Sequence, residues 1–137
     1  MANFIASACT RVADLPRVDV TGMDPALLPL FRPEVQGFLI NVFSYDPAKL
    51  ISTVAKPVLI MQGKRDIQVA VADAERLKQM NPKAELVLLP DTNHVLKTVS
   101  SDDRWANGAT YADPSLPLAP GVVDAVVSFV TAAAKNP

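Results

Sequence analysis

The sequence predicts a small α/β protein whose centre is a β-α-β unit with two parallel strands. Two short runs, 58–61 and 86–89, are continuously apolar rather than alternating, as is typical of parallel strands covered on both faces. Between them, residues 69–80 have the periodicity of an amphipathic helix. Asp66 follows the first run, and His94, the single histidine, follows the second. We therefore expect both side chains at the carboxyl ends of neighbouring strands, where open α/β sheets build their sites.

The composition sets the size of the protein and excludes several classes of function. A chain of 137 residues with 50% hydrophobic and 20% charged residues is typical of one globular domain. The formal net charge of −1 and the scattered Lys and Arg residues give no basic surface, so we expect no nucleic acid and no membrane partner. Cys9 is the only cysteine, which excludes an intrachain disulfide and leaves too few ligands for zinc. We expect no cofactor, no metal and a cytoplasmic location.

The N-terminal part is expected to hold a lead-in segment and three short helices. Residues 1–23 show no clear hydrophobic period, whereas a domain is predicted over residues 24–137, with helices over 24–55 and the β-α-β unit within 56–137. Helix-start signals recur three times before the first strand, at Asp24-Pro25, Pro33-Glu34 and Asp46-Pro47. The second helix is apolar and aromatic along one face, which suits a pocket lid or a protein interface equally well.

The C-terminal part is predicted to contain the central unit, a long loop and a final helix. Gly63 allows the chain to turn out of the first strand, and the helix that follows carries an apolar stripe that ends at Met80. The polar segment from Ser100 to Pro120 indicates a long loop, in which Trp105 and Tyr111 would be buried against the body of the protein. Residues 121–135 indicate a helix with a wide apolar sector, which we expect to pack on the sheet.

Three stretches of the chain resemble the C-terminal half of the serine hydrolases with the α/β-hydrolase fold, of the esterase, lipase and aminopeptidase type. They are LPLFRPEVQGFLINVFSYDPAKLISTVAKPVLIMQGKRDIQV, DAERLKQMNPKAELVLLPDTNHVLK and YADPSLPLAPGVVDAVVSFV. The resemblance implies a partial α/β-hydrolase fold in which Asp66 is the acid and His94 the base of a Ser-Asp-His triad. Residues 24–55 would then correspond to the end of the cap over the acyl pocket. The first strands, the oxyanion loop and the nucleophile elbow of that family would come before this segment.

A nucleophile is missing from the sequence. The fold carries its serine in a G-x-S-x-G turn ahead of the acid, but the three serines before Asp66 lack glycine two residues to either side, and no two of the five glycines are four residues apart. An acid and a base alone supply neither a covalent intermediate nor an oxyanion hole. We therefore expect hydrolysis of an ester or amide bond only when a partner bearing the nucleophile, an N-terminal hydrolase half, completes the site.

Simpler structural roles exist for the same residues. Asp66 also suits a turn that caps the helix beginning near Val69, and His94 also suits a loop histidine bonded to nearby backbone. Their joint placement across one β-α-β unit favours the catalytic pair. Lys64 and Arg65 are expected to be solvated cations without a role in the site.

Two parallel strands alone form an incomplete sheet, which indicates a further partner. The unpaired edge of strand 58–61 would expose backbone groups and adjacent apolar helices. A second copy could cover this edge through a two-fold axis, so we expect a homodimer. The alternative function is therefore a non-catalytic homodimeric module that binds a small molecule or a peptide in an apolar cleft.

Overall fold

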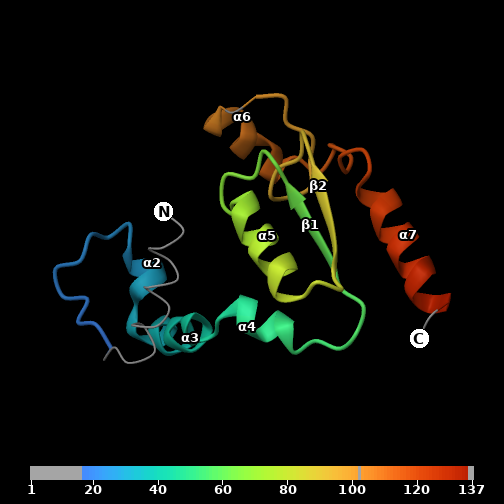
Figure 1. The fold of residues 1–137 in the computed structure, drawn as a ribbon. Coiled ribbons are helices and arrows are strands. Elements are labelled where there is room, and N and C mark those ends of the chain that lie inside the picture. Colours follow the sequence, from blue (N-terminus) through green and yellow to red (C-terminus); the bar gives the residue numbers. More distant parts are fainter. Residues whose placement is uncertain (1–16, 102, 136–137) are drawn as a thin grey trace. The chain divides into compact units, whose positions relative to one another are not determined.

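A computed structural model describes residues 17–101 and 103–135, and the chain divides into two compact units, residues 1–50 and 51–137 (Figure 1). Most of the expected lead-in segment, residues 1–16 with Cys9, lies outside the described residues. Asp66 and His94 both belong to the second unit, so the geometry of the candidate site depends on residues 51–137 alone.

The first unit is helical, as expected. It contains α2 (Leu28–Phe31), α3 (Pro33–Ser44) and the start of α4 (Pro47–Ser52), and prolines occupy the first positions of α3 and α4. The α2 helix begins after a turn rather than at Pro25. Gln36 of α3 is buried, and its side-chain amide donates to the carbonyl oxygens of Val18 and Phe31. This one side chain ties α3 to the segment that precedes α2.

The second unit contains the predicted β-α-β arrangement. Its elements are β1 (Leu59–Gly63), α5 (Val71–Met80), β2 (Glu85–Leu89), α6 (Arg104–Ala109), the 3-10 helix η1 (Thr110–Ala112) and α7 (Val122–Lys135). The strands pair in parallel, with Leu59 opposite Glu85 and Gly63 opposite Leu89. The prediction of a small α/β protein with a short parallel sheet is therefore confirmed.

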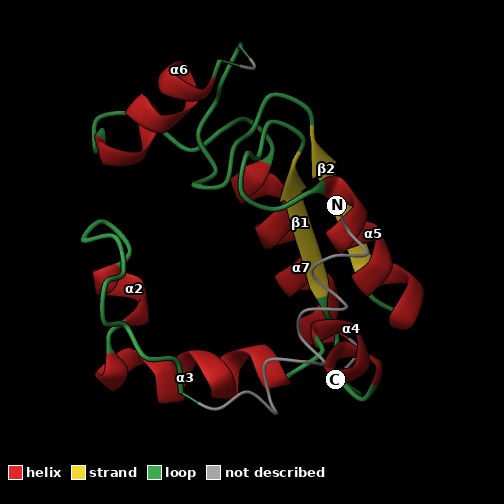
Figure 2. Cartoon of the chain, turned by 90° about the vertical axis from the view of Figure 1, so that its left-hand side faces the viewer, coloured by secondary structure: helices red, strands yellow, loops and turns green. Residues whose placement is uncertain are grey.

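The two faces of the sheet carry different apolar clusters. On one face, Ile60 packs with Ala74 of α5 and with Ala84, and Leu77 and Leu86 lie against them. On the other face, Leu89 packs with Ala119 and Val122, and Met61, Val87 and Leu96 complete that cluster. Figures 1 and 2 show α5 and α7 on opposite sides of the two strands. Coverage of both faces explains why the strand sequences are continuously apolar.

The segment predicted as a long loop contains two short helices, so that prediction is wrong. The Asp103 carboxylate accepts a hydrogen bond of 2.8 Å from the Ala106 N–H and thereby caps α6, which continues into η1. Trp105 is expected to be buried against the body of the protein, but the residue is 88% exposed. Asn107, two residues later on α6, is the residue that points inward, because it is fully buried.

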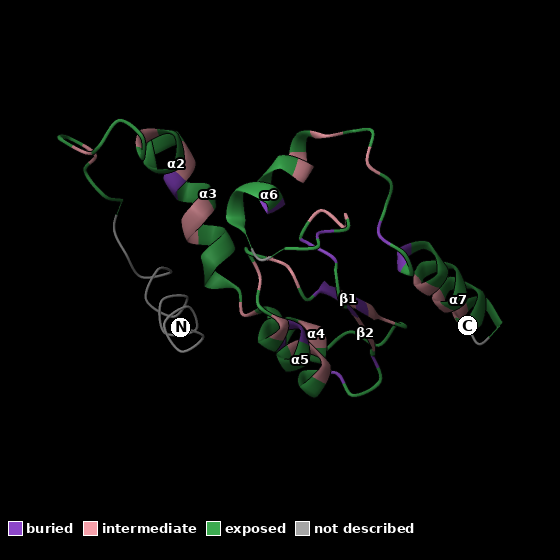
Figure 3. Ribbon diagram, turned by 90° about the horizontal axis from the view of Figure 1, so that it is seen from above, coloured by how far each residue is buried: buried purple, intermediate pink, exposed green. Residues whose placement is uncertain are grey.

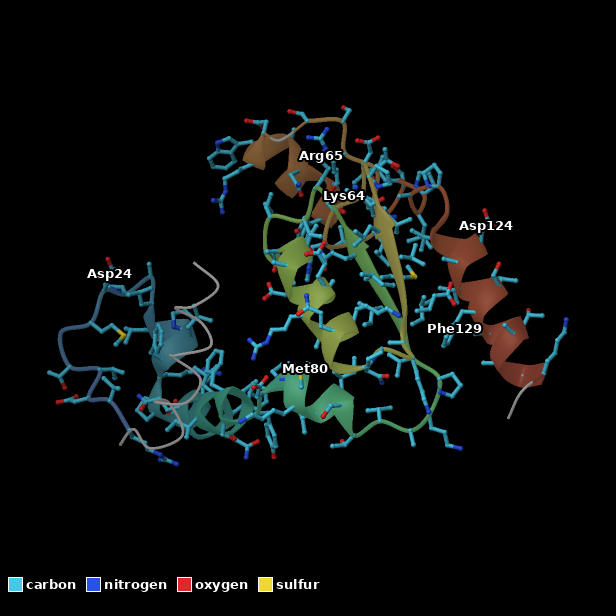
Figure 4. The ribbon with its side chains drawn as sticks, in the orientation of Figure 1. Asp24, Lys64, Arg65, Met80, Asp124 and Phe129 are labelled. Carbon is cyan, nitrogen blue, oxygen red and sulfur yellow. The ribbon has the colours of Figure 1, made fainter. Side chains whose placement is uncertain are left out.

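The final helix, α7, only partly meets the expectation that it packs on the sheet. Val122 is buried and Phe129 is half-buried on the side toward the strands, whereas Asp124 lies on another side of the helix (Figure 4). Four other valines of its apolar sector are exposed, namely Val123, Val126, Val127 and Val130. Figure 3 accordingly shows α7 as largely exposed, with buried residues on the strands, on the loops after them and at single positions of the helices. None of the helices in residues 17–101 and 103–135 combines the length and apolar character needed to cross a membrane.

Candidate acid–histidine site

Asp66 and His94 meet at the carboxyl ends of β1 and β2, as their spacing in the sequence predicts. The His94 Nδ1 atom lies 2.9 Å from the Asp66 Oδ2 atom. An ionised carboxylate only accepts hydrogen bonds, so this contact requires the proton of the neutral imidazole on Nδ1. The Asp66 side chain is 5% exposed and the His94 side chain 40% exposed. The acid is therefore shielded, while part of the imidazole faces solvent.

Asp66 combines the two roles that the sequence left open for it. Its Oδ1 atom accepts the backbone N–H groups of Gln68 at 2.7 Å and Val69 at 2.9 Å, which fixes the turn after β1. Its Oδ2 atom is left for His94 and for the amide of Gln62 at 3.2 Å. Because α5 begins only at Val71, Asp66 stabilises the turn before the helix rather than capping the helix itself. The turn role fixes the carboxylate in the orientation that the histidine contact needs.

The hydrogen bonds also determine the charge of the carboxyl group. Burial raises the pKa of Asp66, but the N–H groups of Val69 and Gln68, together with His94 and Gln62, stabilise the anion and leave the pKa below the usual aspartate value. Asp66 is therefore ionised at neutral pH. An anion beside Nδ1 favours the tautomer with a free Nε2 lone pair and stabilises the imidazolium that forms when Nε2 accepts a proton.

Gln62 is a site residue that the sequence analysis missed. It lies within β1, is buried, and its Nε2 group donates to the Gly63 carbonyl, the Asp66 carboxylate and the Val69 carbonyl. The available signal was a polar residue at the end of an otherwise apolar strand. Such a residue must find hydrogen-bond partners when it is buried, and in this protein the partners are the acid and its turn.

The backbone after β1 is joined directly to the loop after β2. The Lys64 N–H donates to the Leu89 carbonyl at 2.9 Å, and the Arg65 N–H donates to the Thr92 carbonyl at 3.0 Å. At Gly63, an added Cβ atom would lie 2.6 Å from the carbonyl carbon of Thr92, closer than side chains approach backbone. Glycine is therefore required at this position for the two loops to approach each other.

His94 belongs to a tight turn that is closed by its neighbour Asn93. The Asn93 N–H donates to the Lys97 carbonyl, and the Asn93 Oδ1 atom accepts the Lys97 N–H at 3.0 Å. Leu96 has a φ of 59°, an unfavourable region for a residue with a side chain. Its N–H donates to the Asn93 carbonyl, and its side chain contributes to the cluster around Leu89. These contacts hold the strained turn in place.

Lys64 and Arg65, the cations beside Asp66, support the site through their backbone N–H groups. Lys64 is exposed, and the Arg65 Nε atom lies 3.6 Å from Asp91 in an ion pair close to solvent. Both residues lie at the strand ends near α6 (Figure 4). A surface ion pair of this kind contributes little stability. The backbone N–H bonds of Lys64 and Arg65 to the carbonyls of Leu89 and Thr92 therefore contribute more to holding the two loops together. Within the described part of the chain, no group of three His, Cys, Asp or Glu side chains could hold a metal ion.

The arrangement of Asp66 and His94 is suited to moving a proton. Among the described residues, Asp66 is the one hydrogen-bond partner of the His94 ring, so no serine or threonine hydroxyl of residues 17–101 and 103–135 is hydrogen-bonded to it. The half-exposed imidazole is free to accept a proton at Nε2. Comparisons with protein-family models, with curated proteins and with solved structures found no match to this chain.

Proposed function

We propose that this chain supplies the acid and the base of a Ser-Asp-His triad of the α/β-hydrolase type. It would act in ester or amide hydrolysis once a serine nucleophile from outside these 137 residues is placed beside His94. The observation that carries the proposal is the 2.9 Å contact between Asp66 Oδ2 and His94 Nδ1 at the carboxyl ends of two parallel strands. Asp66 would orient the ring, and His94 would remove the serine proton through Nε2.

The accessibility of the two side chains supports this assignment of roles. A triad acid works from a shielded position and a triad base must reach the substrate, and Asp66 and His94 are 5% and 40% exposed, respectively. The lowered pKa of Asp66 keeps the carboxylate ionised near neutral pH, so that it can hold the ring with Nδ1–H toward it and Nε2 free to accept a proton. The segment with the serine would also have to supply the oxyanion hole.

The experiment is a complementation assay. The full chain is mixed with a separately produced first half of an α/β-hydrolase, which carries the oxyanion loop and the G-x-S-x-G turn, and hydrolysis of a short p-nitrophenyl ester is followed. Matched samples contain His94→Gln, Asp66→Asn or an alanine in place of the added serine. The chain alone is expected to show no turnover that depends on His94.

The kcat of the complemented sample is expected to fall by about 10⁶-fold when His94 or the serine is replaced, since these two triad members act as a unit. Hydrolysis that proceeds equally well with His94→Gln would contradict the proposal. So would the absence of turnover from a complex whose formation is verified by light scattering.

A second candidate function follows from the unpaired surfaces of the second unit. In the described residues the sheet has two strands only, so β1 has an outer edge without a strand partner. The exposed valines of α7 add an apolar surface to the same unit. We propose as the alternative a non-catalytic homodimer in which a second copy covers these surfaces and a small molecule or a peptide is bound. The native mass in solution tests this alternative.

A further inference from the structure

Two buried asparagines lie beside the acid–histidine pair without taking part in its chemistry. Asn93 and Asn107 are both 0% exposed, whereas their neighbours His94 and Trp105 are exposed. Burying a side-chain amide costs free energy unless its donors and acceptor are bonded, so each amide must have specific partners. Their partners include backbone groups of the two loops that carry Asp66 and His94.

Asn107 connects α6 to the loop of the acid. Its Nδ2 group donates to the carbonyl oxygen of Arg65 at 2.7 Å, and Arg65 is the residue directly before Asp66. Its Oδ1 atom accepts a hydrogen bond of 3.2 Å from the Nδ2 group of Asn93. One side chain from α6 therefore bonds to both loops.

Asn93 continues the network to the loop of the base. Besides Asn107, its Nδ2 group donates to the Thr110 hydroxyl at 2.6 Å, and its Oδ1 atom accepts the Lys97 N–H. Thr110 in turn donates to the Asn107 carbonyl at 2.8 Å. Because Asn93 directly precedes His94, the network ends at the backbone that carries the imidazole.

We propose that Asn107 is a positioning residue for the Asp66–His94 pair. Its amide links the two loops so that the carboxylate and the imidazole keep the alignment of a triad. This inference rests on the proposed function, because alignment matters for a proton transfer. Buried hydrogen bonds are strong in a low dielectric and fix geometry in both partners. An error of about 1 Å in such a pair can reduce a rate by about 100-fold.

The single histidine provides a direct measurement. In ¹⁵N-labelled protein, the two ring nitrogens of His94 report which of them carries the proton of the neutral imidazole, without overlap from another histidine. Variants Asn107→Ser and Asn107→Asp each remove the amide that donates to Arg65. Asn81→Ser is the matched control. Asn81 is also a buried asparagine, and its amide donates to the carbonyls of Ile51 and Val54, but it lies before β2, whereas Asn93 and Asn107 follow that strand.

In the wild type the proton is expected on Nδ1, facing Asp66. In a folded Asn107 variant the ratio of Nδ1–H to Nε2–H should fall by about tenfold, the effect of losing roughly one charge-assisted hydrogen bond. Asn81→Ser should lower stability and leave that ratio unchanged. Circular dichroism establishes that each variant is folded.

Three results would overturn the proposal. The first is a folded Asn107 variant in which the ratio of Nδ1–H to Nε2–H is unchanged, and the second is an equal fall of that ratio in Asn81→Ser. The third is a failure of both Asn107 variants to fold where Asn81→Ser folds, since this would assign Asn107 to general stability. Failure of the proposed function gives a different result. A complemented chain without turnover but with an intact Nδ1–H signal would contradict the hydrolase assignment, and it would leave the positioning role of Asn107 in place.

Discussion

Gly63 and Thr92 lie in direct backbone contact, so the end of β1 touches the loop that carries His94. This contact and the N–H bonds of Lys64 and Arg65 set the spacing between the loop that carries Asp66 and the loop that carries His94. The closeness depends on the absence of a Cβ atom at residue 63. The Asp66–His94 geometry therefore depends on glycine at this position.

Replacing Gly63 by alanine is expected to destabilise the protein. The added methyl group would overlap the backbone of Thr92, which cannot move away as a flexible side chain can, so we expect a loss of about 3 kcal/mol, the upper part of the range for overpacking. Urea denaturation followed by circular dichroism measures the effect. Gly108→Ala is the control, since a Cβ there meets no atom within 4 Å and lies within α6. It should be neutral or stabilise by about 0.5–1 kcal/mol, and equal losses at both positions would contradict the contact.

The Asp66 carboxylate should contribute stability that disappears in acid. Its pKa is lowered in the folded protein, so its contribution is fully present above the unfolded-state value of about 3.9 and is lost as the pH falls through the folded value. The free energy of unfolding of the wild type should therefore fall more steeply below about pH 4 than that of Asp66→Asn.

The difference between the two urea curves, measured from pH 7 to pH 2.5, isolates this group. Asp113→Asn is a useful comparison because the lowered pKa of Asp113 arises on the surface, from hydrogen bonds with Ser115. Parallel curves for the wild type and Asp66→Asn would show that the carboxylate is not stabilised as described.

Asp66→Asn should also reverse the tautomer of His94. The Oδ1 position of Asp66 accepts the N–H groups of Gln68 and Val69, so the amide oxygen of asparagine should occupy that position and its nitrogen the Oδ2 position, where it donates. A donor facing Nδ1 favours an unprotonated Nδ1, so the proton should move to Nε2. Nitrogen NMR of the single histidine measures this change, with Asp91→Asn as a control for the loss of one negative charge near the same loop. A wild type and an Asp66→Asn variant with the same tautomer would exclude the contact in solution.

The native mass decides between a monomer and the proposed homodimer. Light scattering should give twice the chain mass of 14.7 kDa if a second copy covers the exposed surfaces. The pair Val127→Glu and Val130→Lys places charges on the exposed apolar face of α7 and should shift the dimer to the monomer. The pair Ser128→Glu and Thr131→Lys adds the same charges to the polar side and should leave the mass unchanged. A wild-type monomer would refute the dimer.

Trp105 provides a simple optical test of the segment after His94. As the single tryptophan and 88% exposed, it should emit like tryptophan in water and be readily quenched by acrylamide in the folded protein. Its emission maximum should shift little on unfolding. A blue-shifted, protected emission in the folded protein would mean that Trp105 is buried, as the sequence analysis expected.

The sequence predicted the β-α-β unit and the meeting of Asp66 with His94 because both depend on local regularity. A continuous apolar run specifies a covered strand, and parallel pairing brings the carboxyl ends of two strands together. The residues that follow those strands are then placed by connectivity alone. The acid and the histidine could be identified without knowledge of any other contact in the protein.

The sequence does not predict α6, because the burial of side chains there runs against their polarity. Trp105 is exposed although it is large and apolar, whereas Asn107 is buried because its amide satisfies the Arg65 carbonyl and the Asn93 amide. Neither partner is close to Asn107 in the sequence, so no periodicity marks the residue. The capping aspartate Asp103 was the one local signal for this helix.

The attachment of α6 has a consequence for how long the site stays formed. Residues 103–112 are joined to the acid and histidine loops through side-chain amides rather than through a strand ladder, so this segment can open while β1 and β2 remain paired. Such a sub-global opening requires less free energy than unfolding of the whole unit. We therefore expect the alignment of His94 with Asp66 to be lost on heating before β1 and β2 separate.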